Sequence, residues 1–205
     1  MNKRGVGIIC LCVSICVYTV VSLFIVIERN NEIKIKDDII NDLSIRLNTI
    51  APQLKFYIEN VGQSIEDIPI TDSVGETQLL SEYMYSHNKL LICRYSNRYC
   101  QQCVDYAISI IRNNSTQSNI DNIIFINDSA NACMLKFDRN NYNINSYSYC
   151  SCNDLRIPAE KVMFPYYMLI DNDLRILNVY FPNKEAKKLG VDAEYVKLIL
   201  QSLAN

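Results

Sequence analysis

Cys100 and Cys103 are separated by two residues, between an apolar run at 89–95 and a segment with helical periodicity. A thiol in the first turn of a helix faces unpaired backbone N–H groups and the positive end of the helix dipole, which favour the thiolate over the thiol. Cys100 is therefore the candidate nucleophile. Cys103 follows one turn along on the same face, close enough to form a disulfide with Cys100 after Cys100 has attacked a substrate.

The same cysteines also allow structural interpretations. In an oxidising compartment, Cys100 and Cys103 could form a disulfide that only fixes the start of the helix. Together with Cys150 and Cys152 they could hold zinc through four thiolates, although a CxC pair is tighter than the usual ligand spacing. A disulfide from Cys150 or Cys152 to Cys133 explains these cysteines better than a zinc site does, but the sequence does not assign which cysteines pair.

Other classes of chemistry have less support. His87 is the only histidine, and it would have to meet Cys100 across the fold to take part in catalysis. Cys93, inside an apolar strand, is expected to be a buried core thiol. The net charge of -2 and the absence of a basic run argue against nucleic-acid binding. No phosphate-binding loop of the P-loop or dinucleotide type is present. We expect no nucleic-acid partner, no metal ion and no dissociable cofactor.

Apolar periodicity predicts an α/β domain over residues 63–205. The expected helices cover 76–85, 100–112, 130–137 and 193–203, and the expected strands cover 90–95, 122–127, 166–170 and 174–181. The last two strands form a hairpin around 171–173. Residues 138–163 are polar and rich in Asn, Tyr and Ser, which predicts a long, irregular insertion.

The amino-terminal part of the chain predicts a membrane anchor. Residues 5–27 carry no charge and could cross about 30 Å of hydrocarbon as a helix. No small residues that would suit a cleavage site follow, so we expect this helix to be retained behind a short tail at 1–4. Lys3 and Arg4 precede it and Arg29, Lys34 and Lys36 soon follow it, so basic residues alone do not decide the orientation. The free amino terminus before the span and the acidic residues after it favour a signal anchor with the domain on the extracytoplasmic, periplasmic side.

Residues 28–62 predict a helical stem. Their apolar residues alternate at spacings of three and four, which is a helical stripe. Pro52 disfavours helix at the residue before it, so we expect one helix to end near Ile50 and a second to begin at Pro52 and end at Gly62. The stripe fits either a short coiled coil that forms a homodimer or a spacer helix that packs on its own domain.

The order strand, CxxC, helix, strand, helix, proline, hairpin and helix resembles the thioredoxin-like superfamily, most closely its membrane-anchored TlpA/ResA-type branch. The matching segments are LLICRYSNRYCQQC at 90–103 and FPYYMLID at 164–171, and the coarse resemblance covers 72–203. It implies a central mixed sheet flanked by helices, behind a transmembrane helix and a helical stem. It also implies a cis peptide bond before Pro165, which would pack against the active-site disulfide, with Phe164 and Tyr99 at the substrate.

By this resemblance Cys100 would exchange disulfides with protein substrates and Cys103 would resolve the mixed disulfide. Tyr99 departs from the usual Trp of the family, and Gln101-Gln102 replaces a Gly-Pro type dipeptide. The sequence shows no evident buried acid for deprotonating Cys103, which leaves the redox potential and direction open. We therefore expect a membrane-anchored thiol-disulfide oxidoreductase. The alternative is a membrane-tethered thioredoxin-like interaction module whose cysteines are structural.

Overall fold

The computed structural model describes residues 3–128, 132–184, 187 and 190–203, without the side chains of 3–16, 49 and 132–134. The chain divides into two compact units, Met1–Asn48 and Thr49–Asn205. In the described part of the chain, we find no helix long and apolar enough to cross a membrane. For residues 5–16 of the expected anchor at 5–27, the structure does not describe the side chains.

Helix α1 (Lys3–Asn60) continues through Pro52, so the expectation of two helices was wrong. A proline inside a helix removes one hydrogen bond and costs about 3 kcal/mol. Contacts after Pro52 offset this cost, because Phe56 is buried in the domain core and the Asn60 side chain donates to the Phe56 carbonyl at 2.7 Å. Asn60 Oδ1 also accepts from the backbone N–H of Ala159 at 2.8 Å. The last turns of α1 are therefore part of the domain.

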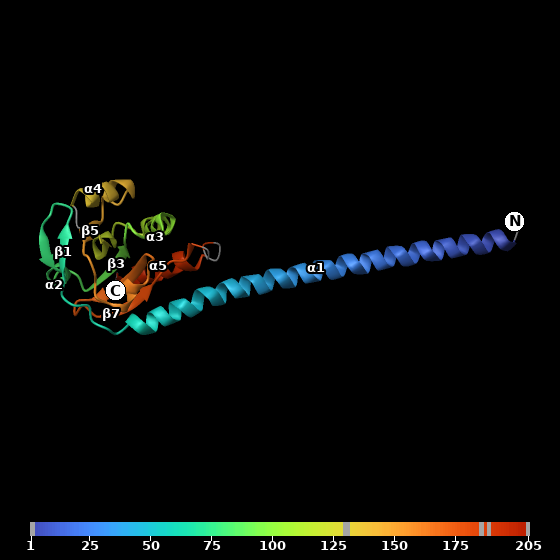
Figure 1. Cartoon of the computed structure of the whole chain (residues 1–205), viewed down its shortest axis with the longest axis horizontal. Helices are drawn as coiled ribbons and strands as arrows, with labels where there is room; N and C mark the ends of the chain where they lie inside the picture. The colour runs from blue at the N-terminus through green and yellow to red at the C-terminus, as the bar shows by residue number, and fades with distance from the viewer. Residues whose placement is uncertain (1–2, 129–131, 185–186, 188–189, 204–205) are drawn as a thin grey trace. The chain divides into compact units, whose positions relative to one another are not determined.

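A seven-stranded mixed sheet forms the centre of the second unit, in the order β2-β1-β5-β4-β3-β6-β7 (Figure 1). Strand β3 is parallel to β4, and β4 is parallel to β5, while the other neighbours are antiparallel. The strands are β1 (Pro69–Asp72), β2 (Thr77–Leu79), β3 (Lys89–Tyr95), β4 (Ile123–Asn127), β5 (Ser148–Ser151), β6 (Tyr166–Asp171) and β7 (Ile176–Tyr180). The helices are α2 (Leu80–Met84), α3 (Gln101–Asn114), α4 (Ala132–Asn141) and α5 (Val191–Leu203), with short 3-10 turns η1 (Ile120–Asn122) and η2 (Pro158–Lys161).

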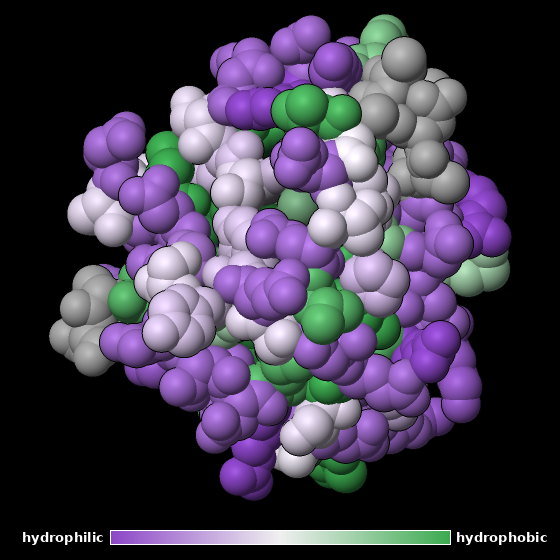
Figure 2. Space-filling model, turned by 90° about the vertical axis from the view of Figure 1, so that its left-hand side faces the viewer, coloured by the Kyte–Doolittle hydropathy of each residue, from purple (hydrophilic) through white to green (hydrophobic). Residues whose placement is uncertain are grey.

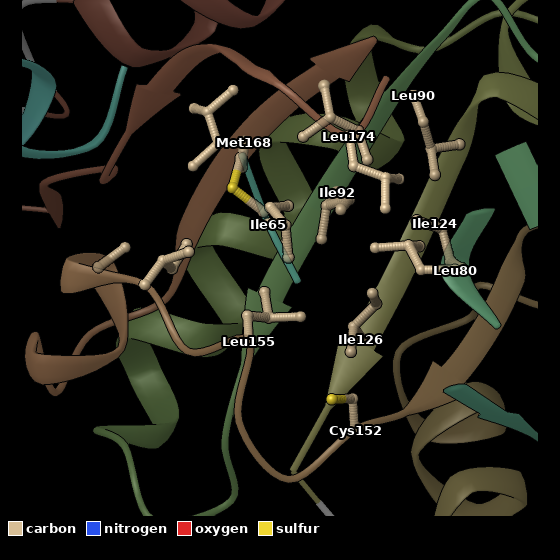
Figure 3. Packing of buried hydrophobic residues seen from close by; sticks show 14 of the residues in the cluster. Ile65, Leu80, Leu90, Ile92, Ile124, Ile126, Cys152, Leu155, Met168 and Leu174 are labelled. Atoms are coloured by element: carbon tan, nitrogen blue, oxygen red, sulfur yellow. The ribbon is translucent and has the colours of Figure 1, made fainter. Parts of the chain in front are cut away.

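Two hydrophobic cores lie on the two faces of this sheet. Successive residues of a strand point to opposite faces, so Leu90 and Ile92 of β3 enter one core and Leu91 and Cys93 enter the other. Figure 3 shows the first core, where Leu90 and Ile92 lie near side chains from neighbouring strands and from α2. Helices α3 and α5 cover the second core. Helix α3 is thereby fixed against the strand that precedes it.

The expected α/β architecture is confirmed, with corrections to its elements. Strand β1 (Pro69–Asp72) was not predicted. The predicted helix at 76–85 is instead strand β2 followed by the short helix α2. The predicted irregular insertion at 138–163 contains the end of α4, strand β5 and η2, so part of it belongs to the sheet. Strand β5 was missed because Ser148–Ser151 is short and carries no β-branched residue, although Tyr149 and Cys150 are buried.

The surface at the β1–β2 edge of the domain is mainly hydrophilic (Figure 2). Hydrophobic residues on this face form small, separate groups. Scattered apolar residues of this kind are normal on a protein surface. The features that could do chemistry lie elsewhere, at the end of β3.

Candidate active site at the start of helix α3

The loop between β3 and α3 places Cys100 at the helix start. Ser96 anchors this loop, since its hydroxyl donates to Asp128 at 2.7 Å and its carbonyl accepts from the Tyr99 N–H at 3.0 Å. Cys100 is the N-cap residue of α3, and its carbonyl accepts from the Cys103 N–H at 2.9 Å. The two cysteines therefore lie within one helical turn, as the sequence predicts. Cys100 is exposed and Cys103 is half-buried.

The surroundings of Cys100 lower its pKa from the ordinary value of 9.0. The largest cause is hydrogen bonding from the Cys103 thiol, followed by the backbone N–H of Cys103. Desolvation opposes the shift, while the Gln102 N–H and the positive charge of Lys184 add to it. The helix start thus favours the thiolate form of an exposed sulfur, which is the nucleophilic form.

Strand β6 brings Pro165 to the same end of the sheet. Tyr166 pairs with Arg94 near the end of β3, so Pro165, one residue earlier, lies where the chain leaves β3 toward Cys100. Pro165 is buried, whereas Phe164 is 48% exposed. Phe164 also lines a hollow with Phe56, Val162 and Phe181, among other residues. Its ring is therefore available to a ligand from the solvent side.

The implied cis peptide bond is not present. None of the described residues has a cis peptide bond, and this includes Pro165. The trans form is the more stable state of a bond before proline, by about 0.5–1 kcal/mol. Tyr99, the third expected substrate residue, is half-buried, and burial raises the pKa of its hydroxyl.

A buried ion pair lies behind this site, and it was not predicted from the sequence. The Arg94 side chain is 1% exposed and binds Glu160 through two hydrogen bonds of 2.8 Å, from Nε and Nη2. Its Nη1 and Nη2 also donate to the carbonyls of Cys152 and Asn153, at 2.8 and 3.0 Å. Tyr166 donates its hydroxyl to Glu160 at 2.5 Å. Burial lowers the pKa of Arg94, but the hydrogen bonds and charge of Glu160 more than offset this, so the net shift is upward.

A second buried acid, Asp138 of α4, lies at the ends of β4 and β5. Its Oδ2 accepts from Asn127 Nδ2 at 3.2 Å and from the Tyr149 hydroxyl at 3.3 Å. Burial raises the pKa of Asp138. The Tyr149 hydroxyl also hydrogen-bonds that of Tyr95. Tyr149 therefore belongs to the core and its polar network, and Tyr142 and Tyr147 are likewise buried.

The other reactive side chains lie apart from the thiol pair. Cys93 is fully buried, as expected, and burial raises its pKa. Cys150 and Cys152 are buried free thiols, while the side chain of Cys133 lies outside the described residues. The described residues include no group of three or more Cys, His, Asp or Glu side chains able to hold a metal ion. His87 precedes β3, where its ring stacks on Tyr83 with 5.2 Å between centroids.

Comparison with solved structures assigns the fold. A protein of Bacteroides thetaiotaomicron, described provisionally as a protein disulfide isomerase, matches with a TM-score of 0.52 at 18% identity, over 73% of this chain and 93% of its own. The fold is thioredoxin-like. The peroxidoxin BcpB of Mycobacterium tuberculosis also has this fold, with a TM-score of 0.50 at 14% identity, over 70% of this chain and 97% of its own. No family model and no curated protein matches the sequence.

Proposed function

We propose that this chain is a thiol-disulfide oxidoreductase that acts on cysteines of proteins. The observation that carries the proposal is the exposed Cys100 at the start of α3, with a lowered pKa and Cys103 one turn away. The thioredoxin-like fold supports it, because two structures with this fold carry redox names, a disulfide isomerase and a peroxidoxin. Phe164, Pro165 and Tyr99 would contact the substrate next to the thiol pair.

The proposed reaction has two exchange steps. The Cys100 thiolate attacks one sulfur of a substrate disulfide, whose S–S bond breaks as the other sulfur leaves with the electron pair as a thiolate. Cys103, once deprotonated, attacks the Cys100 sulfur and releases the second substrate sulfur as a thiolate. The substrate thereby gains two electrons, and Cys100 and Cys103 become joined by a disulfide. The reverse sequence would oxidise a substrate dithiol.

We also propose the setting of this reaction. Residues 5–27 would hold the chain in a membrane, with the domain on the extracytoplasmic side, because this segment is uncharged and basic residues precede it. Of the expected stem at 28–62, residues 28–48 would separate the membrane from the domain and could pair two copies as a dimer, since the last turns of α1 belong to the domain. Labelling intact cells with a membrane-impermeant thiol reagent tests the orientation. Labelling of Cys100 without lysis supports export, and labelling only after lysis contradicts it.

A trapping experiment tests the activity. In full-length Cys103→Ser, Cys100 can still attack a substrate but the mixed disulfide cannot be resolved, so we expect adducts that dithiothreitol releases. The matched control, Cys100→Ser, should form none through this site. If neither variant forms adducts, and Cys100→Ser is merely less stable while still binding its partners, the chain is an interaction module with structural cysteines.

A further inference from the structure

A hollow of about 810 Å³ runs along the exposed face of α3, beginning next to Cys100. We call it the α3 groove; its lining includes Gln101, Gln102, Tyr106, Tyr142, Lys184 and Lys187. Gln101 and Gln102 directly follow Cys100, so one end of the groove opens at the nucleophile. Arg112 lines the other end. Arg112 lies eleven positions after Gln101 along the helix, which corresponds to about 16 Å.

The α3 groove is positively charged although the chain as a whole is slightly acidic, with a net charge of -2. It is lined by Lys184, Lys187 and Arg112, against a single carboxylate, Asp105. None of the ion pairs among the described residues includes any of these three cations. An anion in the groove would therefore meet positive charges that form no ion pair with a carboxylate of the described residues.

Neutral contacts hold the cations and the groove walls in place. Lys184 Nζ donates to Gln102 Oε1, and Arg112 Nη1 donates to the Tyr142 carbonyl at 3.0 Å. The Lys187 ammonium lies 5.9 Å from the centre of the Tyr106 ring. These contacts fix the positions of the cations while leaving their charge available to a ligand.

We propose that the α3 groove binds an acidic segment of the substrate protein, next to the cysteine that exchanges with Cys100. An extended chain advances about 3.3 Å per residue, so about five residues span the groove. The groove selects substrates by charge, whereas Cys100 and Cys103 carry out the exchange. This inference rests on the proposed function, because it takes the substrate to be a protein disulfide.

Two peptides of equal length provide the test. Each peptide carries one cysteine joined to 5-thio-2-nitrobenzoate through a disulfide. Five residues follow this cysteine, which are Asp and Glu in one peptide and Asn and Gln at the same positions in the other. Attack by Cys100 on the peptide sulfur breaks this disulfide and releases the coloured thiolate, while Cys103 then displaces the peptide. The rate is measured with reduced full-length protein in detergent, at about 20 mM and about 500 mM salt.

We expect the acidic peptide to react about fivefold faster at low salt, with the preference lost at high salt, because solvent-exposed charge pairs of this kind are weak and screened. Lys184→Met/Lys187→Met should remove the preference. The matched control Lys136→Met/Lys197→Met changes two exposed lysines outside the groove and outside the hollow at Phe164, and should retain it. Equal rates for the two peptides, or a preference that survives in Lys184→Met/Lys187→Met, would overturn the inference.

A binding measurement separates this inference from the proposed function. The same peptides with Ser in place of Cys, labelled with a fluorophore, report binding to the full-length chain by anisotropy without any exchange. Tighter binding of the acidic peptide, with no thiolate release from either disulfide peptide, would support the groove and contradict the oxidoreductase. Thiolate release at equal rates, with equal binding, would leave the oxidoreductase standing and overturn the groove.

Discussion

Replacing Arg94 by Gln should strongly destabilise the domain, because it leaves the Glu160 carboxylate buried without its cation. The Arg94 and Glu160 side chains are 1% and 13% exposed, and Arg94 makes two hydrogen bonds to Glu160 and two to backbone carbonyls. Without the guanidinium, the Glu160 carboxylate loses its cation and two hydrogen bonds, and the Tyr166 hydroxyl is a remaining donor. Breaking a buried pair in this way costs about 3–5 kcal/mol, against a total stability of about 5–15 kcal/mol for a domain.

Arg98→Gln is the matched control for this prediction. Arg98 also bonds one carboxylate, Asp128, but its side chain is 79% exposed, so the expected loss is about 0–1 kcal/mol. Removing both buried charges in Arg94→Met/Glu160→Met should restore much of the stability, because no unpaired charge remains. The assay is urea unfolding of the full-length chain followed by tyrosine fluorescence. A loss below about 1 kcal/mol for Arg94→Gln would refute the assignment of this pair as a buried structural contact.

Three further predictions concern the thiol, the second buried acid and the domain boundary. Cys103→Ala should raise the pKa of Cys100, since the Cys103 thiol is the largest cause of its lowered value. The pH dependence of the rate at which Cys100 is alkylated measures this pKa. An unchanged midpoint of that pH profile would contradict the prediction. Burial raises the pKa of Asp138, so the folded chain binds a proton more readily than the unfolded chain. The stability of the wild type relative to Asp138→Asn should therefore rise as the pH falls from the raised pKa toward the ordinary value of 3.8. Urea unfolding of both proteins at several pH values measures this difference. Phe56→Ala should cost about 3–5 kcal/mol if the end of α1 belongs to the core. Leu47 is 66% exposed, so Leu47→Ala should change the stability of the domain little, and equal losses for both variants would contradict the boundary.

The sequence predicts the strands and helix that position the thiol pair because their signals are local. The apolar run at 89–95 and the periodicity after Cys100 correspond to β3 and α3. The sequence did not predict the short elements whose structure depends on tertiary contacts. Strand β5 has only four residues, two of them serines, and is held by pairing with β4 and β1. Helix α1 continues through Pro52 because the turns after it are anchored in the domain, which no local signal reveals.

The sequence predicted only part of the candidate site, because some of its residues have local signals and others are brought together by the fold. The positions of Cys100 and Cys103 follow from spacing and helix geometry, and the structure places them as expected. Glu160 and Asp138 come from segments far along the chain, so only the fold shows that Glu160 pairs with Arg94 and that Asp138 is buried. A charge inside the apolar run, at Arg94, was the one available signal of a buried partner, because buried arginines are almost always paired.

The redox state of Cys100 and Cys103 tests the central claim most directly. The full-length chain would be equilibrated in buffers of defined potential, and the two thiols read by alkylation and mass spectrometry. The account predicts a reversible two-electron transition of this pair between roughly -120 and -270 mV, the range of proteins that exchange disulfides. A pair that stays oxidised below about -300 mV, as structural disulfides do, or that never forms a disulfide, would contradict it.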